Sequence, residues 1–256
     1  MEPHLDAARI VLLGAAALLA GGVNAVAGGG SLVTFPALLL VGYAPLTANV
    51  TNAVALLPGY LGGTVGYRRE LRGQGGRMLR LGLLSVGGAV LGAFLLLKGP
   101  PSVFQRLVPW LILGACALLV AQPWIARRVA ERTRSGLGLG EVSLALAVVQ
   151  VVSAVYGAYF GAGLGVIMLA TLGIFVDDSL QRVNALKGWL SLVINAVAVV
   201  AFVLYGGVAW VPVAVMAPLS YAGGMLGVLV ARRLDDRVLR VAVVCFGVAV
   251  GVRLLV

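Results

Sequence analysis

The sequence predicts an all-α polytopic membrane protein with two inverted-topology repeats of about five helical segments, each repeat holding a Gly-broken helix and a short half-helix. Three observations predict this architecture. The 256 residues are 61% hydrophobic and only 11% charged, which is too little charge to cover the surface of a soluble domain. The apolar residues form long blocks separated by short arginine clusters, as transmembrane helices do. Two blocks are short, and each follows a glycine cluster.

Ten apolar blocks follow one another along the chain, and most are long enough to span about 30 Å of hydrocarbon. In order they cover residues 8–27, 31–42, 46–66, 78–97, 103–125, 141–160, 163–176, 179–205, 208–230 and 238–256. The first five blocks are long, short, long, long and long, and the second five blocks repeat this order. We therefore expect a first transmembrane repeat at 1–135 and a second at 136–256. The "GLGLG" stretch at 136–140 has no βαβ unit around it, so we interpret it as a linker.

Arginine clusters predict the orientation of the chain. The net charge is +10, and the basic residues lie between the blocks, so we attribute them to the positive-inside rule rather than to nucleic-acid binding. Clusters follow blocks three, five and nine. All three face the cytoplasm only if each long–short pair enters the membrane and returns. The second repeat is then upside down relative to the first, as in many secondary transporters.

Glycine breaks precede both short blocks, as "GGGS" at 28–31 and "GAGLG" at 161–165. A break at membrane depth frees backbone groups that lipid cannot satisfy, and the following half-helix presents N–H groups and a partial positive charge. Close helix packing through small residues is the alternative explanation. Because the breaks occupy corresponding positions of two repeats, we favour an anion site formed by Gly28, Gly29, Gly30, Ser31, Gly161 and Gly163.

Polar residues recur at helical spacing on four blocks. A single polar residue of this kind often only joins helices by a hydrogen bond, but four stripes near the breaks favour a polar cavity. The stripes are Gly21, Asn24 and Gly28; Asn49, Asn52 and Tyr60, with Thr51 beside them; Gln150, Ser153, Gly157 and Gly161; and Asn184, Lys187, Ser191 and Asn195.

Lys187 lies eight residues into its block at 179–205, which corresponds to a depth of about 12 Å at 1.5 Å per residue. It either extends to the interface or pairs with Asp177 or Asp178, or it attracts an anionic substrate. No acidic residue lies deep in any block, so a buried-carboxylate proton relay is not expected. The single His4 and the isolated Cys116 and Cys245 predict no metal, no cofactor and no enzymatic activity.

Two segments resemble the signatures of the TauE/SafE family of sulfite-exporter permeases. Residues 24–70, "NAVAGGGSLVTFPALLLVGYAPLTANVTNAVALLPGYLGGTVGYRRE", match a Gly-Gly-Gly break, a Pro-x-Leu half-helix and an Ala-x-x-Thr-(Ser/Asn) pair, here Ala48, Thr51 and Asn52. Residues 157–210 are similar to the second signature, including the Asn-x-x-Lys pair at Asn184 and Lys187. The resemblance implies transport of sulfur-containing anions such as sulfite, thiosulfate or sulfoacetate. Where the family commonly has Thr-Ser, this chain has Thr51-Asn52.

These observations together predict a bacterial inner-membrane permease that works by alternating access, one repeat rocking against the other. The expected partners are a small sulfur-containing anion and membrane lipid, with no nucleic acid, and a homodimer is an open alternative. An anion channel and a non-transporting membrane scaffold are the rival functions. The expected substrate-binding residues are Asn24, Gly28, Gly29, Gly30, Ser31, Thr51, Asn52, Gly161, Gly163, Asn184, Lys187 and Ser191.

Cysteine accessibility labelling tests the predicted orientation. In a background without Cys116 and Cys245, a cysteine at residue 133 is expected to react only from the cytoplasm, because it lies in an arginine cluster. A cysteine at residue 4 is expected to react from outside. Labelling of residue 133 from outside would contradict the inverted repeats.

Overall fold

The structure is a computed structural model that describes residues 3, 5–26, 28–134, 143–230 and 237–255, and in these ranges it contains ten α-helices and no strand. The helices are α1 (Ala7–Val26), α2 (Ser31–Val41), α3 (Pro45–Gly66), α4 (Gly75–Lys98), α5 (Pro101–Arg134), α6 (Leu144–Tyr159), α7 (Leu164–Phe175), α8 (Leu180–Tyr205), α9 (Trp210–Val230) and α10 (Arg237–Arg253). The all-helical prediction is confirmed. By length and composition, α1, α4, α5, α8 and α9 are able to cross a membrane. The predicted linker at 136–140 lies outside the described residues.

The predicted blocks match the helices closely, except at the end of α5. The apolar block ends at residue 125, but the helix continues to Arg134. Hydropathy marks where a helix leaves hydrocarbon and carries no signal for where its backbone hydrogen bonds stop. In these extra turns the Arg128 guanidinium lies 4.9 Å from the centre of the Trp124 ring, a cation–π contact.

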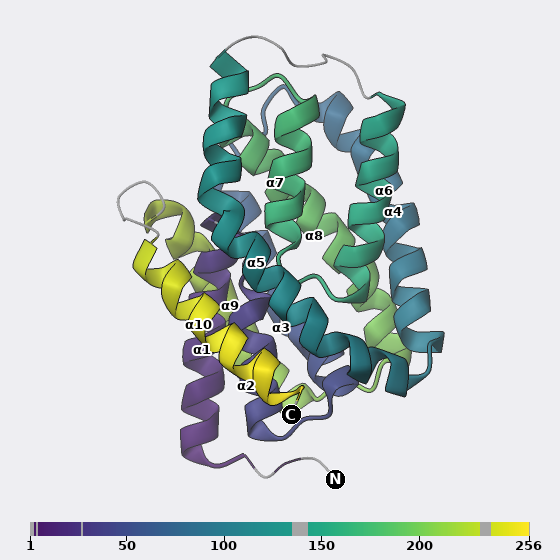
Figure 1. The fold of residues 1–256 in the computed structure, drawn as a ribbon, viewed down its shortest axis with the longest axis vertical. Helices are drawn as coiled ribbons and strands as arrows, with labels where there is room; N and C mark the ends of the chain where they lie inside the picture. Colours follow the sequence, from purple (N-terminus) through teal and green to yellow (C-terminus); the bar gives the residue numbers. More distant parts are fainter. Residues whose placement is uncertain (1–2, 4, 27, 135–142, 231–236, 256) are drawn as a thin grey trace.

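Each short helix turns back beside the helix that precedes it (Figure 1). The pair α1 and α2 opens toward the end of the molecule where both chain termini lie, and the pair α6 and α7 opens toward the opposite end (Figure 1). Gly28, Gly161 and Gly163 make these reversals with φ of +81°, +76° and +75°, a conformation that only glycine adopts without strain. Both long–short pairs are therefore hairpins in the structure, while their entry into the membrane and return on the same side stays a prediction.

The two reversals touch each other in the middle of the molecule. The Gly165 N–H donates to the Gly28 carbonyl over 3.3 Å. A Cβ on Gly28 would lie 2.3 Å from the Gly165 Cα, and a Cβ on Gly165 would lie 2.4 Å from the Gly28 Cα. Two backbones approach this closely only where neither residue has a side chain.

One long helix from each half of the chain packs against helices of the other half. Helix α9 packs on α1 and α3, and α4 packs on α6 and α8. Glycines permit both contacts, since Cβ atoms on Gly59 and Gly92 would lie 2.9 and 2.2 Å from the Ser220 and Val155 carbonyl oxygens. Two helix groups result, which we call group A (α1, α2, α3 and α9) and group B (α4, α6, α7 and α8).

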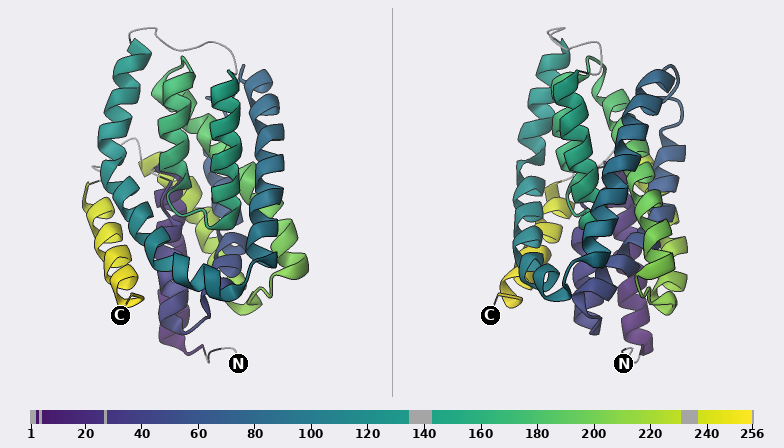
Figure 2. Two further views of the ribbon diagram at one scale, coloured as in Figure 1. Left: turned by 45° about the vertical axis from the view of Figure 1, so that its right-hand side comes forward. Right: turned by 90° about the vertical axis from the view of Figure 1, so that its right-hand side faces the viewer.

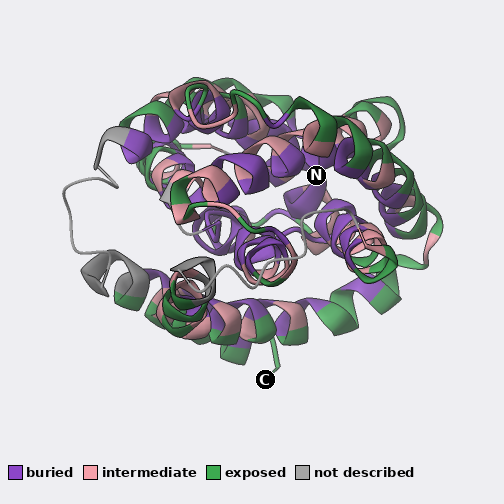
Figure 3. Cartoon of the chain, turned by 90° about the horizontal axis from the view of Figure 1, so that it is seen from above, coloured by how far each residue is buried: buried purple, intermediate pink, exposed green. Residues whose placement is uncertain are grey.

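Helices α5 and α10 pack on the outside of these groups. Helix α5 contacts α7, and α10 contacts α2 and α5; Figure 2 shows α10 at the periphery of the molecule. Seen from above in Figure 3, buried residues face inward and exposed ones lie on the outer rim. Large apolar side chains such as Val11, Leu83 and Val152 are exposed on this rim, where lipid rather than water suits them.

Gly165→Ala is expected to destabilise the protein, because its methyl group would overlap the Gly28 backbone. Overpacking of this kind costs about 1–3 kcal/mol. The measurement is the unfolding temperature of the purified protein in detergent. Gly87→Ala in α4 is the matched control, since a Cβ there meets nothing within 4 Å. Equal unfolding temperatures for the two variants would show that the crossing tolerates a side chain.

Candidate functional site

Four helices bring polar side chains together around Tyr60. The Tyr60 hydroxyl of α3 interacts with the side chains of Ser31 in α2, Asn195 in α8 and Asn24 in α1. All four residues are buried. Three of the predicted polar stripes thus meet at one place, which we call the Tyr60 cluster. The sequence identified Tyr60 and Asn195 as stripe members but did not select them as substrate-binding residues.

Asn24 stabilises the beginning of α2. Its Oδ1 accepts the Gly30 N–H over 2.7 Å, so it satisfies one of the free donors that a helix N-terminus leaves. Its Nδ2, by contrast, forms no hydrogen bond of good geometry in the described part of the chain, although the Tyr60 hydroxyl lies nearby. Asn24 is only 6% exposed, and a buried unpaired donor is costly.

The second break is built differently from the first. Gly157 precedes Gly161 by the four residues that separate Asn24 from Gly28, so it offers no capping side chain. Among the described residues, no side chain caps the N-terminus of α7. The Tyr156 hydroxyl instead donates to the Ala162 carbonyl over 2.5 Å. Only the first break therefore carries polar side chains directly at its half-helix.

Helix α5 covers part of both breaks. A Cβ on Gly29 would lie 3.3 Å from Leu119, and a Cβ on Gly163 would lie 3.3 Å from Ala115. Packing thus favours small residues at both positions, and Gly163 also requires glycine for its φ of +75°. Gly28 serves the crossing with Gly165, so these three glycines of the predicted site have a structural role in addition to any contact with an anion.

Lys187 lies on the inward face of α8 and is 2% exposed. It stands one turn from Asn184, which donates to the Tyr67 hydroxyl over 3.2 Å, and one turn from Ser191, which contacts the Met168 sulfur at 3.5 Å. These neighbours place the stripe against α3 and α7. Such deep burial argues against a side chain that extends to the interface.

Thr51 and Asn52 do not reach the Tyr60 cluster. The Thr51 hydroxyl accepts the Ala209 N–H over 3.0 Å, just before α9 begins. The Asn52 Oδ1 accepts the Thr34 hydroxyl over 2.5 Å. Both residues therefore fasten α3 to neighbouring elements, about two turns before Tyr60.

The polar stripe of α6 also points elsewhere. Gln150 donates to the Ser85 hydroxyl of α4 over 2.7 Å, and a Cβ on Gly157 would lie 2.7 Å from Leu164 and 3.0 Å from Ile194. This stripe joins α6 to its neighbours in group B, so three stripes rather than four form the cluster.

Asp178 holds the arginine-rich end of the molecule together. Its carboxylate pairs with Arg77 at 2.9 Å and with Arg182 at 2.7 Å. Arg182 also donates to the Arg72 carbonyl over 3.0 Å. Burial raises the pKa of Asp178, but hydrogen bonds from Arg182, Ser179 and Arg77 and the charge of Arg182 outweigh burial and hold the pKa below its ordinary value of 3.8. This acid therefore has two arginine partners of its own, close to where the sequence suggested a pair with Lys187.

The crossed helix breaks and the buried Lys187 occur in a bundle whose helices α1, α4, α5, α8 and α9 are long and apolar enough to cross a membrane. This arrangement is typical of multi-pass membrane transporters. The family described as "Sulfite exporter TauE/SafE" matches residues 13–254. The chain belongs to this family of transporters, which are not enzymes, and the resemblance seen in the sequence is confirmed.

Several relatives cover most of the chain. A probable membrane transporter protein, ORF9, of a Sinorhizobium species is 26% identical over 96% of this chain and 92% of its own. The probable membrane transporter protein YfcA of Escherichia coli K12 is 25% identical over 93% and 87%. A probable membrane transporter protein of Haemophilus influenzae is 27% identical over 85% and 83%. No solved structure matches the chain significantly.

Asp178→Asn is expected to lower the unfolding temperature at neutral pH, because it removes the carboxylate that joins Arg77 and Arg182. A depressed pKa stabilises the fold fully above the ordinary value of 3.8, and this stabilisation is lost as pH falls through the lower folded-state pKa. The difference between variant and wild type is therefore expected to shrink in acid. Asp177→Asn, at an exposed neighbouring position, is the matched control. A difference that is independent of pH would contradict the charge pairing.

Proposed function

We propose that this chain transports small sulfur-containing anions, such as sulfite, thiosulfate or organosulfonates including sulfoacetate, and binds them between the Tyr60 cluster and Lys187. The observation that carries the proposal is the Asn24 Nδ2, a buried donor without a well-formed hydrogen bond beside the N-terminus of α2. An anion oxygen at this point would satisfy it. The family description supports the substrate class, and the names of the relatives support transport.

The donors of the cluster match the chemistry of a sulfite or sulfonate group. These anions present several acceptor oxygens around one sulfur, and Asn24, Ser31, Tyr60 and Asn195 carry amide or hydroxyl donors. The N-terminus of α2 adds a partial positive charge. Lys187 is the one charged residue that is buried among the described residues, so the field inside the molecule favours an anion.

Inverted repeats are part of the proposal. The contacts of α9 with α1 and α3 correspond to those of α4 with α6 and α8, and the two hairpins open toward opposite ends (Figure 1). Because α4 and α9 each pack against helices of the other half of the chain, we propose that the moving bodies are groups A and B rather than the two sequence repeats. Alternating access would then separate these groups at one end at a time.

Two hydrogen bonds between the groups lie on either side of the Tyr60 cluster. At the arginine-rich end, Asn184 of α8 donates to the Tyr67 hydroxyl at the end of α3 over 3.2 Å. Toward the other end, Asn49 of α3 donates to the Tyr159 carbonyl of α6 over 3.0 Å. Opening one contact while the other persists would give access from one side alone.

Lys187→Met is expected to weaken anion binding by roughly 10- to 150-fold, because a charge-assisted hydrogen bond contributes about 1.5–3 kcal/mol. Binding of sulfite, thiosulfate and sulfoacetate to the purified protein is the measurement. Lys187→Arg keeps the charge but replaces a compact ammonium by a planar fork, so it is expected to restore binding only in part.

Lys98→Met is the matched control, since Lys98 is the other lysine of the sequence and is exposed at the end of α4. Its dissociation constant is expected to equal that of the wild type. An unchanged dissociation constant in well-folded Lys187→Met would remove Lys187 from the site. Absence of substrate-dependent flux into proteoliposomes would overturn the transport of these anions altogether.

A further inference from the structure

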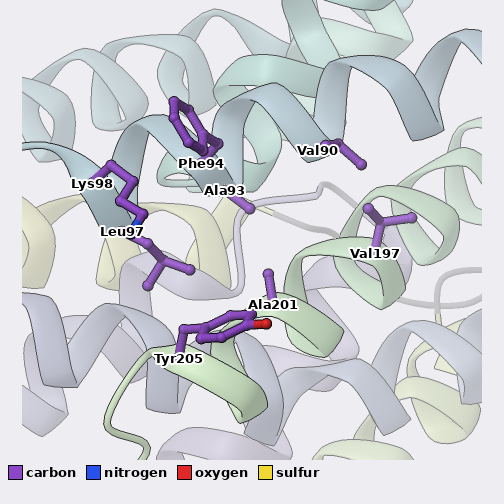
Figure 4. A pocket seen from close by; sticks show the side chains of 8 residues that line it. All are labelled: Val90, Ala93, Phe94, Leu97, Lys98, Val197, Ala201 and Tyr205. Atoms are coloured by element: carbon purple, nitrogen blue, oxygen red, sulfur yellow. The ribbon is translucent and has the colours of Figure 1, made fainter.

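A groove on the outer surface lies between the last two turns of α4 and the last two turns of α8 (Figure 4). Its volume is about 630 Å³. Ala93 and Ala201 are the small residues along its length, while Phe94 and Tyr205 stand beside them and are 56% and 78% exposed. The side chains that line the groove come from these two helices alone (Figure 4). It is separate from the Tyr60 cluster, to which α4 contributes no residue.

The groove combines an apolar length with one charged end. Its α4 wall runs from Val90 to Lys98, about 12 Å at 1.5 Å per residue. That length is most of the roughly 15 Å that one leaflet contributes to a 30 Å hydrocarbon core. Lys98, the last residue of α4, and Tyr205, the last residue of α8, both stand at the same end of the groove.

We propose that this groove binds one anionic phospholipid, with an acyl chain between α4 and α8 and the headgroup phosphate on Lys98. Lysine and tyrosine at helix ends occupy the depth of lipid headgroups, where tyrosine rings anchor a protein and a lysine meets phosphate. The apolar wall below them suits a chain of methylene groups. The charge at the mouth therefore selects among lipids, and the groove itself accommodates the chain that all of them share.

Charge complementarity favours a lipid over a second copy of this chain. Helices α1 to α4 and α6 to α10 contain no acidic residue, and the one acid of α5 is Glu131, near its opposite end. A helix of a second copy lying in the groove would therefore bring no anion to Lys98 from its apolar length. A phospholipid supplies both the anion and the apolar chain.

Photo-crosslinking of the purified full-length protein in phosphatidylcholine nanodiscs tests the proposal. A phosphatidylglycerol with a photoreactive acyl chain is expected to label peptides that contain residues 90–98 and 197–205. Unlabelled phosphatidylglycerol is expected to compete at a roughly fivefold lower concentration than phosphatidylcholine, the ratio that corresponds to about 1 kcal/mol for one basic residue near anionic lipid. The proposal would be overturned by uniform labelling of all exposed helices, or by equal competition from the two lipids.

Two pairs of variants locate the effect. Lys98→Gln is expected to abolish the fivefold preference, whereas Arg253→Gln, which removes an exposed charge at the end of α10, is expected to preserve it. Ala201→Phe is expected to fill the groove and prevent labelling, whereas Val200→Phe on the exposed face of α8 is expected to leave the labelling unchanged.

A disulfide between two copies carrying Val197→Cys, in a background without Cys116 and Cys245, would assign the groove to a dimer and overturn the proposal. None of these outcomes depends on which anion the protein transports.

Discussion

Backbone groups at membrane depth need partners inside the protein, and this constraint shapes the whole molecule. Each helix break frees N–H and C=O groups that lipid cannot satisfy. Local turns satisfy several of these groups, as where the Gly28 N–H donates to the Val23 carbonyl, and the crossing of the two breaks adds the bond from the Gly165 N–H to the Gly28 carbonyl. The crossing requires that neither residue has a side chain. The two hairpins open toward opposite ends of the molecule, and their tips meet in the middle (Figure 1).

The exchange of α4 and α9 follows from the same constraint. Two hairpins that touch only at their tips bury little surface, so each needs a long helix against its flank. Helix α9, from the second half of the chain, covers α1 and α3 of the first half. Helix α4, from the first half, covers α6 and α8 of the second half. The halves are therefore interlocked, so groups A and B, the bodies that we propose to move, each contain helices from both halves.

Both breaks reverse the chain, but they differ in backbone and in chemistry, since Gly30 before α2 has φ −59° and Gly163 before α7 has φ +75°. Asn24 caps the first half-helix and keeps a spare amide donor, whereas Gly157 takes the equivalent place before the second. Tyr60 on α3 and Lys187 on α8 likewise have no counterpart of the same type in the other half. The two halves thus carry different donors. In the site that we propose, the anion contacts one half-helix directly, and the charge of Lys187 comes from a helix of the other half.

The helices, the breaks and the membrane-embedded class were predictable from the sequence, because hydropathy and glycine content act locally along the chain. It also determined which face of each helix is polar, since a 3.6-residue period fixes the face. Which faces meet became clear only from the packing of the folded chain. Tyr60 interacts with Asn195. By contrast, the Thr51 hydroxyl accepts the Ala209 N–H just before α9, and Gln150 donates to the Ser85 hydroxyl of α4. Periodicity gives the direction of a side chain around its own helix axis, but the helix opposite is chosen by packing between segments far apart in the chain.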